Sequence, residues 1–262
     1  MMIQDFLTRK VEMFSVTIVT VCFNSANTIR DTIESVLSQT YPDIEYIIVD
    51  GGSTDDTINI VKGYGDKITK VISEPDQGIY DAMNKGIRLA SGNAIGILNS
   101  DDVFFSTNTI KTVADIFTEN PHLDGLYADL VYVKKNDINK VTRSYSSKFF
   151  SPWKIRFGLI FPHPTLYLRP SAFKKVGLYK LNYRVAADFE MMARITMKKL
   201  NIIRNPNIMV KMREGGISGT GIWWIFHQNL EIVRACKENG IYTNIIFLIL
   251  KVPIKLISYL KR

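Results

Sequence analysis

The sequence predicts an α/β protein with a doubly wound, mostly parallel sheet and helices on both faces. Two observations carry this prediction: apolar, β-branched segments alternate with segments of helical periodicity, and turn residues separate them. A strand that is covered on both faces usually has a continuous apolar sequence. Helices of roughly 10 to 15 residues between strands are typical of parallel βαβ units. With 262 residues, 46% of them hydrophobic, the chain is long enough to bury a full core.

The first half of the chain carries the clearest pattern. Residues 16–22 are apolar or Thr throughout, and the helical periodicity that follows stops before Pro42. In order, the pattern predicts strands over residues 16–22, 44–49, 68–72 and 94–98, and helices over residues 29–39, about 54–64 and 79–90.

The second half is expected to be more helical. A helix is predicted over residues 110–117, followed by a strand over 125–133 and a hairpin turn at Asn136 and Asp137 that leads back to Tyr145. Beyond this hairpin we expect helices to dominate, at residues 171–176 and 187–199.

The positive charge is concentrated in the last quarter of the chain. Of the formal net charge of +8, residues 197–262 supply 11 Lys and Arg against 3 Asp and Glu, whereas residues 1–196 hold 22 of each kind. No zinc-finger, recognition-helix or RNA-binding-strand signature accompanies this charge, so we expect no nucleic-acid partner.

Residues 241–262 form an apolar and basic tail. Aliphatic residues are interleaved there with Lys251, Lys255, Lys261 and Arg262. The uncharged run 241–250 is shorter than the roughly 20 apolar residues that span a bilayer. Such a mixture is typical of a segment lying on anionic lipid, so we expect contact with a membrane surface. The alternative is a terminal helix that packs on the domain.

The N-terminal residues do not combine a basic start, an apolar stretch and a small-residue cleavage site. Cys22 and Cys236 show neither metal-ligand spacing nor a disulfide framework. We therefore expect a cytoplasmic protein, peripheral on the cytoplasmic face of the membrane, whose two thiols are reduced.

The most informative segment is Asn99-Ser100-Asp101-Asp102, directly after the apolar run 94–98. Carboxylates just past the end of a parallel strand lie where open α/β sheets bind ligands, and hard oxygen ligands suit Mg²⁺ or Mn²⁺ carrying a phosphate. These acids therefore predict a metal-diphosphate site. The alternative is a turn that merely favours Asp and Ser.

Acids follow two other predicted strands. Asp50 precedes Gly51 and Gly52, whose missing side chains permit close approach of a ligand, and Asp76 precedes Gly78. A carboxylate at such a place can accept hydrogen bonds from a base or from ribose hydroxyls. Residues 23–27 contain no Gly-x-Gly-x-x-Gly turn and no Walker A sequence is present, which argues against dinucleotide and P-loop binding.

Four ordered motifs together resemble the family 2 glycosyltransferases of the GT-A fold. They are VTVCFN at 19–24, VDGGSTD at 49–55, DQGIYDAMNKG at 76–86 and NSDD at 99–102. The resemblance covers about residues 14–215. It implies transfer of a sugar from a nucleotide-diphosphate donor, with inversion at the anomeric carbon. Within the family, the chain resembles bacterial enzymes that build surface polysaccharides.

The resemblance assigns roles to the strand-end residues. It implies that Asp50 binds the nucleoside base and Asp76 the ribose and base, with Asn24 and Gly52 beside the nucleotide. It further implies that Asp101 and Asp102 hold the metal, Mn²⁺ or Mg²⁺, and that Asp101 also faces the diphosphate. Many members have Asp where this chain has Asn99, which can contact the donor sugar but brings no charge.

Residues outside these motifs are further candidates. Asp188 stands where similar enzymes keep the general base, and Glu190, two residues later on the same helix, should point away from it. His163 lies between prolines and contacts either a sugar or a structural partner, while Arg213 precedes two glycines and is available for a phosphate. Trp223 is a candidate acceptor contact, with ordinary packing as the alternative.

These observations predict an inverting, metal-dependent transferase of a hexosyl or N-acetylhexosaminyl group from a UDP-sugar to a glycan or lipid-linked acceptor. We expect a domain over residues 14–215, with a nucleotide-binding half at 14–105 and an acceptor half at 106–215, and a helical appendage at 216–262. One alternative is a non-catalytic nucleotide-sugar-binding protein. A nucleotidyltransferase is disfavoured because residues 23–27 form no Gly- and Lys-rich loop.

Overall fold

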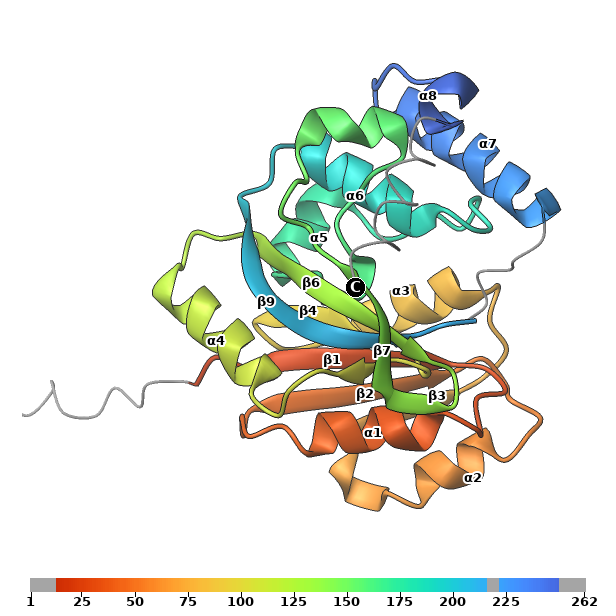
Figure 1. Ribbon diagram of the computed structural model, residues 1–262. Helices are drawn as coiled ribbons and strands as arrows, with labels where there is room; N and C mark the ends of the chain where they lie inside the picture. Colours follow the sequence, from red (N-terminus) through yellow and green to blue (C-terminus); the bar gives the residue numbers. More distant parts are fainter. Residues whose placement is uncertain (1–12, 216–221, 250–262) are drawn as a thin grey trace, which may run out of the picture.

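The protein folds around one nine-stranded mixed sheet with helices on both faces (Figure 1). The computed structural model describes residues 13–215 and 222–249, without the side chains of residues 222 and 223. The strands run in the order β3-β2-β1-β4-β8-β6-β9-β5, and β7 pairs with β6 outside this path. The predicted α/β fold with helices on both faces is confirmed.

The elements have the following bounds. The strands are β1 (Val16–Cys22), β2 (Ile44–Asp50), β3 (Lys70–Ser73), β4 (Ala94–Ile97), β5 (Val103–Phe104), β6 (Gly125–Lys134), β7 (Asp137–Tyr145), β8 (Tyr167–Leu168) and β9 (Ile202–Arg213). The α-helices are α1 (Ile29–Leu37), α2 (Thr57–Lys62), α3 (Ile79–Leu89), α4 (Thr109–Glu119), α5 (Pro170–Val176), α6 (Ala187–Met197), α7 (Ile222–Glu238) and α8 (Ile245–Ile249). The 3₁₀ helices are η1 (Gly65–Lys67), η2 (Pro152–Phe157) and η3 (His163–Thr165).

The first half is a parallel α/β unit, as its sequence pattern predicts. β1 pairs in parallel with β2 and β4, and β2 pairs in parallel with β3. Alternate side chains of β1 point to opposite faces of the sheet. Val19 and Val21 pack in the core beside α3, whereas Ile18 packs in the core beside α1. This double coverage explains why β1 is buried at every position.

The second half is less helical than the sequence predicts. β9, a twelve-residue strand, pairs in parallel with β6 and lies between β6 and β5 in the sheet, although helices were expected to dominate after Tyr145. Pro206 breaks the strand pattern in the sequence, because proline cannot donate to a sheet ladder. The structure accommodates it in a bulge, since Tyr127 pairs with Arg204 and Asp129 with Ile208.

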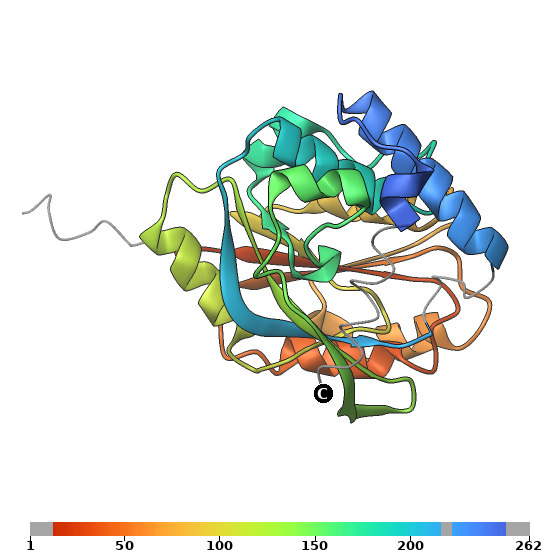
Figure 2. The same cartoon turned by 45° about the horizontal axis from the view of Figure 1, so that its top comes forward.

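The C-terminal helices pack on the face of the sheet that carries α3, α5 and α6 (Figures 1 and 2). Ile232, Ala235 and Cys236 of α7 are buried in that core, and Leu248 of α8 joins them. Cys22 and Cys236 are free cysteines, and both are buried. Within residues 13–215 and 222–249, no helix is both long and apolar enough to cross a membrane.

The tight contact between α3 and β1 depends on Gly86. A Cβ atom added there would lie 2.2 Å from Cγ1 of Val19. We predict that Gly86→Ala lowers the free energy of unfolding by about 1–3 kcal/mol, because overpacking outweighs the better helix propensity of alanine. Urea unfolding of the single variants and of Gly86→Ala with Val19→Ala measures the coupling. Full additivity of the two changes would contradict this contact.

Candidate active site

The candidate site lies along the sheet edge where β1, β2, β3 and β4 end, at the right of the sheet in Figure 1. Parallel strands end at the same edge, so residues distant in sequence meet there. Cys22, Asp50 and Ser73 form one row across β1, β2 and β3. The loops that leave this row carry the predicted nucleotide-binding residues.

Asp50 is fully buried at the centre of this row. Its carboxylate accepts hydrogen bonds from the Ser73 hydroxyl at 2.7 Å and from the Ser53 backbone N–H at 3.1 Å, and another from the Ser53 hydroxyl. Cys22 donates a weaker bond at 3.7 Å, and burial together with Asp50 raises the pKa of this thiol, so it stays protonated. In this state Asp50 fixes the loop after β2, and its contact with a base stays a prediction.

Asn24 has a similar bridging position. Its backbone is in the left-handed region at φ 49°, its N–H donates to Ser53 Oγ at 2.8 Å, and its side-chain oxygen accepts from the Thr54 N–H at 2.9 Å. Gly52, at φ 80°, lies against Pro75 of the next loop. These contacts tie the loops of this edge together, and the roles of Asn24 and Gly52 beside the nucleotide stay predictions.

Asp76 lies against Gly51 and is paired with a lysine. A Cβ atom on Gly51 would come within 2.9 Å of its carboxylate. Lys85 Nζ lies 2.5 Å from Asp76 and 2.8 Å from Glu74. Hydrogen bonds to these two acids raise the pKa of Lys85, so α3 holds the Asp76 loop through a charged pair.

The segment after β4 contains buried oxygen atoms without partners. Asp102 is fully buried, and its Oδ2 accepts a long 3.4 Å hydrogen bond from the Asn99 side chain. Among the described residues, Asp102 Oδ1 and Asn99 Oδ1 have no hydrogen-bond partner. Burial raises the pKa of Asp102 well above its ordinary range, and the charge of Asp101 adds to this shift. Buried polar atoms in native proteins nearly always have partners, and a ligand bound at this place would supply the partners that these two atoms lack.

The residues present fit a divalent cation. In the described part of the chain, no group of three or more His, Cys, Asp or Glu residues is placed to hold a metal alone. Mg²⁺ is commonly bound by one or two carboxylates together with substrate phosphates, which matches the Asp101 and Asp102 pair. The charge of Arg213 lowers the pKa of Asp101, although burial raises it overall.

Arg213 joins the end of β9 to this segment. Its guanidinium donates to the backbone oxygen of Asp101 at 3.0 Å and to that of Lys135 at 2.8 Å, and it forms an ion pair with Asp31 of α1. These bonds use three of the five N–H donors of the guanidinium, and the contact of Arg213 with a phosphate stays a prediction. Asp31 carries no motif signal in the sequence and was not expected here.

Asp188 and His163 come together through two tyrosines. Tyr80 of α3 donates its hydroxyl to the Val185 carbonyl at 2.8 Å and contacts Asp188 Oδ1 at 3.3 Å. His163 Nε2 lies 2.6 Å from the Tyr179 hydroxyl, and the Tyr179 ring stacks on Tyr80. Burial lowers the pKa of His163, opposed by the charge of Asp188, so the imidazole is neutral at neutral pH.

Asn84 fixes this cluster from α3. Its side chain makes two hydrogen bonds to the backbone of Tyr179, at 2.8 and 2.9 Å. Glu190 is turned away, since it is fully buried in ion pairs with Lys180 and Arg194, both at 2.9 Å. The side chain of Trp223 lies outside the described residues, so its predicted acceptor contact cannot be placed.

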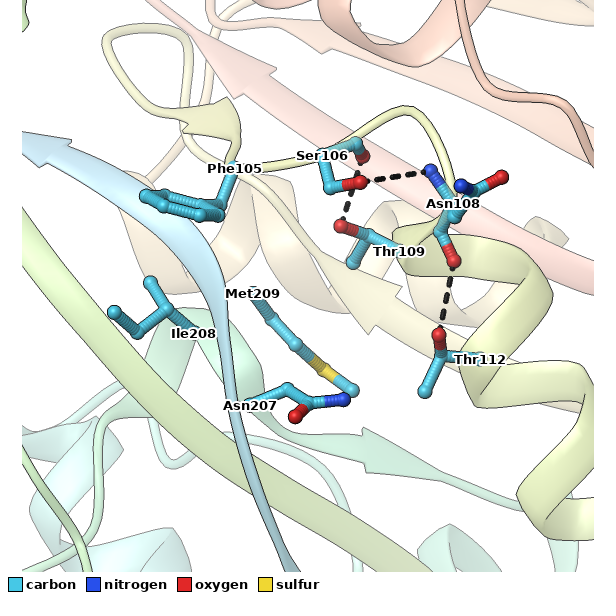
Figure 3. Close-up of a pocket in the computed structure, with 8 residues that line it drawn as sticks. All are labelled: Phe105, Ser106, Asn108, Thr109, Thr112, Asn207, Ile208 and Met209. Atoms are coloured by element: carbon cyan, nitrogen blue, oxygen red, sulfur yellow. Dashed lines mark hydrogen bonds between the residues drawn. The ribbon is translucent and has the colours of Figure 1, made fainter.

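Two pockets flank these elements. A pocket of about 280 Å³ lies beside Tyr80 and is lined by residues 77–80 and 181–184. A larger one of about 380 Å³ lies between residues 105–112 and β9 (Figure 3). Its hydroxyl groups bond to nearby backbone, as with Thr109 to the Ser106 carbonyl at 2.9 Å, and its lining contains no acid or histidine. The chemistry therefore favours the acid-bearing edge over the larger pocket.

Comparison with known proteins agrees with this geometry. The model of the family described as Glycosyl transferase family 2 matches residues 17–185. A PGL/p-HBAD biosynthesis glycosyltransferase of Mycobacterium bovis is 30% identical over 213 residues, covering 79% of this chain and 80% of the relative. An uncharacterized glycosyltransferase of Rickettsia prowazekii is 32% identical over 184 residues, covering 67% of this chain and 57% of the relative.

Solved structures share the fold. The 1–349 fragment of S. aureus TarS, in complex with UDP-GlcNAc, has a TM-score of 0.67 at 19% identity, covering 84% of this chain and 66% of that chain. The mannosyltransferase PcManGT of Pyrobaculum calidifontis, in complex with GDP-Man and Mn²⁺, has a TM-score of 0.63 at 18% identity, covering 85% and 63%. This chain spans 39% of a longer TarS chain.

The fold is therefore the GT-A fold of glycosyltransferases. The chain belongs to glycosyl transferase family 2, since the family model matches more than half of it, and the predicted resemblance is confirmed.

The contrast between Asp50 and Asp102 predicts opposite stability effects. Asp50→Asn should lower the free energy of unfolding by about 2–3 kcal/mol, because it weakens charge-assisted hydrogen bonds. Asp102→Asn should raise it by about 1 kcal/mol at pH 8, because it removes a buried unpaired charge.

Urea unfolding at several pH values, without metal, measures both effects. Because the folded-state pKa of Asp102 is raised, its carboxyl destabilises the fold as pH rises above the ordinary pKa of an unfolded Asp, about 4, and this effect diminishes as pH falls toward that value. The advantage of Asp102→Asn should therefore shrink toward pH 5. An equal loss of stability in both variants would show that Asp102 has partners in the folded protein.

Proposed function

We propose that this glycosyltransferase transfers a sugar, hexosyl or N-acetylhexosaminyl, from a UDP-sugar to a hydroxyl of a glycan or lipid-linked acceptor, with inversion. The observation that carries the donor side is the pair of unpartnered buried oxygens on Asn99 and Asp102 at the strand-end edge. The complexes of TarS with UDP-GlcNAc and of PcManGT with GDP-Man and Mn²⁺ support a nucleotide-sugar donor. A role in surface polysaccharide biosynthesis, which the motif resemblance implies, is part of this proposal.

On the donor side, Asp50, Asp76, Asn24 and Gly52 would surround the nucleoside. Asn99 would contact the donor sugar, and Arg213 the diphosphate. Asp101 and Asp102 would hold Mn²⁺ or Mg²⁺, which when bound offsets the negative charge on the diphosphate.

On the acceptor side, Asp188 would act as the general base. In the inverting reaction it removes the proton of the acceptor hydroxyl while that oxygen bonds to the anomeric carbon and the bond from this carbon to the diphosphate breaks. Both hydrogen bonds to Asp188 within the described part of the chain fall on Oδ1. One comes from the Phe189 N–H, and the other from the Tyr80 hydroxyl, whose single proton is shared with the Val185 carbonyl. They orient the carboxylate and leave Oδ2 for the proton. Neutral His163 and Trp223 would contact the acceptor.

Asp188→Asn should abolish transfer and leave donor binding nearly intact. Loss of a general base costs about 10²–10⁴-fold in turnover. Release of nucleoside diphosphate from a panel of UDP- and GDP-sugars, with lipid-linked and free glycan acceptors, measures turnover, and calorimetry measures donor affinity. Near wild-type turnover in Asp188→Asn would refute the assignment.

Two further variants, one at Tyr80 and one control, belong to this experiment. Tyr80→Phe keeps the carboxylate but removes one of its hydrogen bonds, so turnover should fall by about 10-fold. Asp115→Asn, at an exposed ion pair with Lys111 on α4, is the matched control and should retain full turnover.

Nucleotide binding should depend on a divalent cation. Calorimetry with UDP and GDP, each with Mn²⁺, Mg²⁺ or EDTA, tests base preference and metal need together. Asp101→Ala and Asp102→Ala should each weaken metal-dependent binding by about 10-fold or more, while metal-free binding changes little. Equal nucleotide affinity with metal and with EDTA would argue against the metal site.

A further inference from the structure

An exposed apolar surface lies away from the strand-end site. Among the described residues, the four most exposed large apolar side chains are Tyr242 at 70%, Phe149 at 69%, Ile246 at 68% and Ile249 at 60%. All four lie on two segments, 146–157 and 241–249, which are far apart in sequence. Such a concentration on one surface of a folded domain marks an interaction site rather than the scattered apolar residues of ordinary surfaces.

The two segments form one surface because they pack on each other. The Phe157 ring of η2 lies 5.3 Å from the Phe247 ring of α8, and the Thr243 hydroxyl donates to the Arg156 carbonyl. Trp153, 56% exposed, packs edge-on against Phe157 at 5.6 Å. Figures 1 and 2 show α8 on the side of the sheet opposite α1 and α2. We call this surface, residues 146–157 with 241–249, the aromatic patch.

The charge around the patch has one sign. Residues 146–157 and 241–249 hold three basic residues, Lys148, Lys154 and Arg156, and no Asp or Glu. Lys148 and Lys154 lie 5.7 and 5.8 Å from the ring centres of Phe149 and Trp153. Glu238, at the end of α7, is already paired with Lys180 at 2.8 Å and Arg234 at 3.6 Å.

We propose that the aromatic patch is a membrane-docking surface that lies on a bilayer rich in anionic lipid. Exposed tryptophan, other aromatic and aliphatic side chains enter the interface between headgroups and acyl chains, and flanking lysines bind anionic headgroups. Residues 250–262 continue directly from α8 with six aliphatic and four basic residues, the composition that the same surface requires. The aromatic 146–157 segment is thus a second membrane contact, supplied by the catalytic domain itself. This proposal does not depend on the donor or the reaction.

Vesicle co-sedimentation of the full chain tests it. The wild type should bind vesicles of phosphatidylcholine with phosphatidylglycerol, and bind pure phosphatidylcholine at least about 10-fold more weakly. Phe149→Ser with Trp153→Ser should weaken binding to the anionic vesicles by about 10-fold or more. Lys148→Gln with Lys154→Gln should weaken it by about 30-fold, at about fivefold per charge.

The matched control is Phe105→Ser with Lys211→Gln. Phe105, directly after β5, is 41% exposed, and Lys211 Nζ lies 5.7 Å from its ring centre, so the pair reproduces an exposed aromatic with a lysine at another place. This variant should bind vesicles like the wild type. Near-ultraviolet circular dichroism and release of nucleoside diphosphate from the donor confirm that each patch variant is folded.

Three outcomes would overturn the proposal. One is a wild-type chain that does not bind anionic vesicles. Another is undiminished binding by the Phe149 and Trp153 variant together with loss of binding on deletion of residues 250–262, which would make the tail alone the contact. The third is a dimer in light scattering that the same variant dissociates without any vesicle binding by the wild type, which would make the patch a contact between two copies.

Discussion

The alignment of three parallel strand ends, held by the Asp50 carboxylate, is the constraint on which the site depends. Cys22, Asp50 and Ser73 occupy one row of the sheet, and the side chains of Cys22 and Ser73 donate to the aspartate between them. A fully buried carboxylate is costly unless its oxygens have partners, and here the partners come from both neighbouring strands and from the following loop. The loops that leave these strands therefore start from fixed positions.

The acids that follow β4 are bonded less completely than Asp50 at the end of β2. Asp102 is as deeply buried as Asp50, yet one of its oxygens has no partner among the described residues, and the same holds for Asn99 beside it. Asp50, by contrast, receives hydrogen bonds from the hydroxyl groups of Ser53 and Ser73. The proposed cation would account for the difference, since a cation compensates a buried carboxylate more completely than a single hydrogen bond. Asn99 is uncharged, so it adds nothing to the negative charge that such a cation would have to compensate.

Sequence pattern was sufficient where elements are long and motifs local. The α-helices and strands between Val16 and Ile97 were predicted to within three residues at each end, and the strand-end acids gather at one edge as expected. β9 was missed because Pro206 and the polar residues around it interrupt the strand pattern, and only pairing with β6 through a bulge makes that segment a strand. Contacts such as Tyr80 with Asp188, or Asp31 with Arg213, join residues more than 100 positions apart. They depend on how distant elements pack, which local pattern does not encode.

Helix α3 connects the two halves of the site. Lys85 on this helix holds the Asp76 loop at the donor edge, whereas Tyr80 contacts Asp188 and Asn84 fixes the backbone of Tyr179. Gly86 lets the same helix pack directly against Val19 of β1. A single rigid element thus sets the distance between the donor edge and the acid that would take the acceptor proton. A displaced α3 would shift both sides at once, and because reacting groups must align within about an ångström, its contact with β1 matters for catalysis as well as for stability.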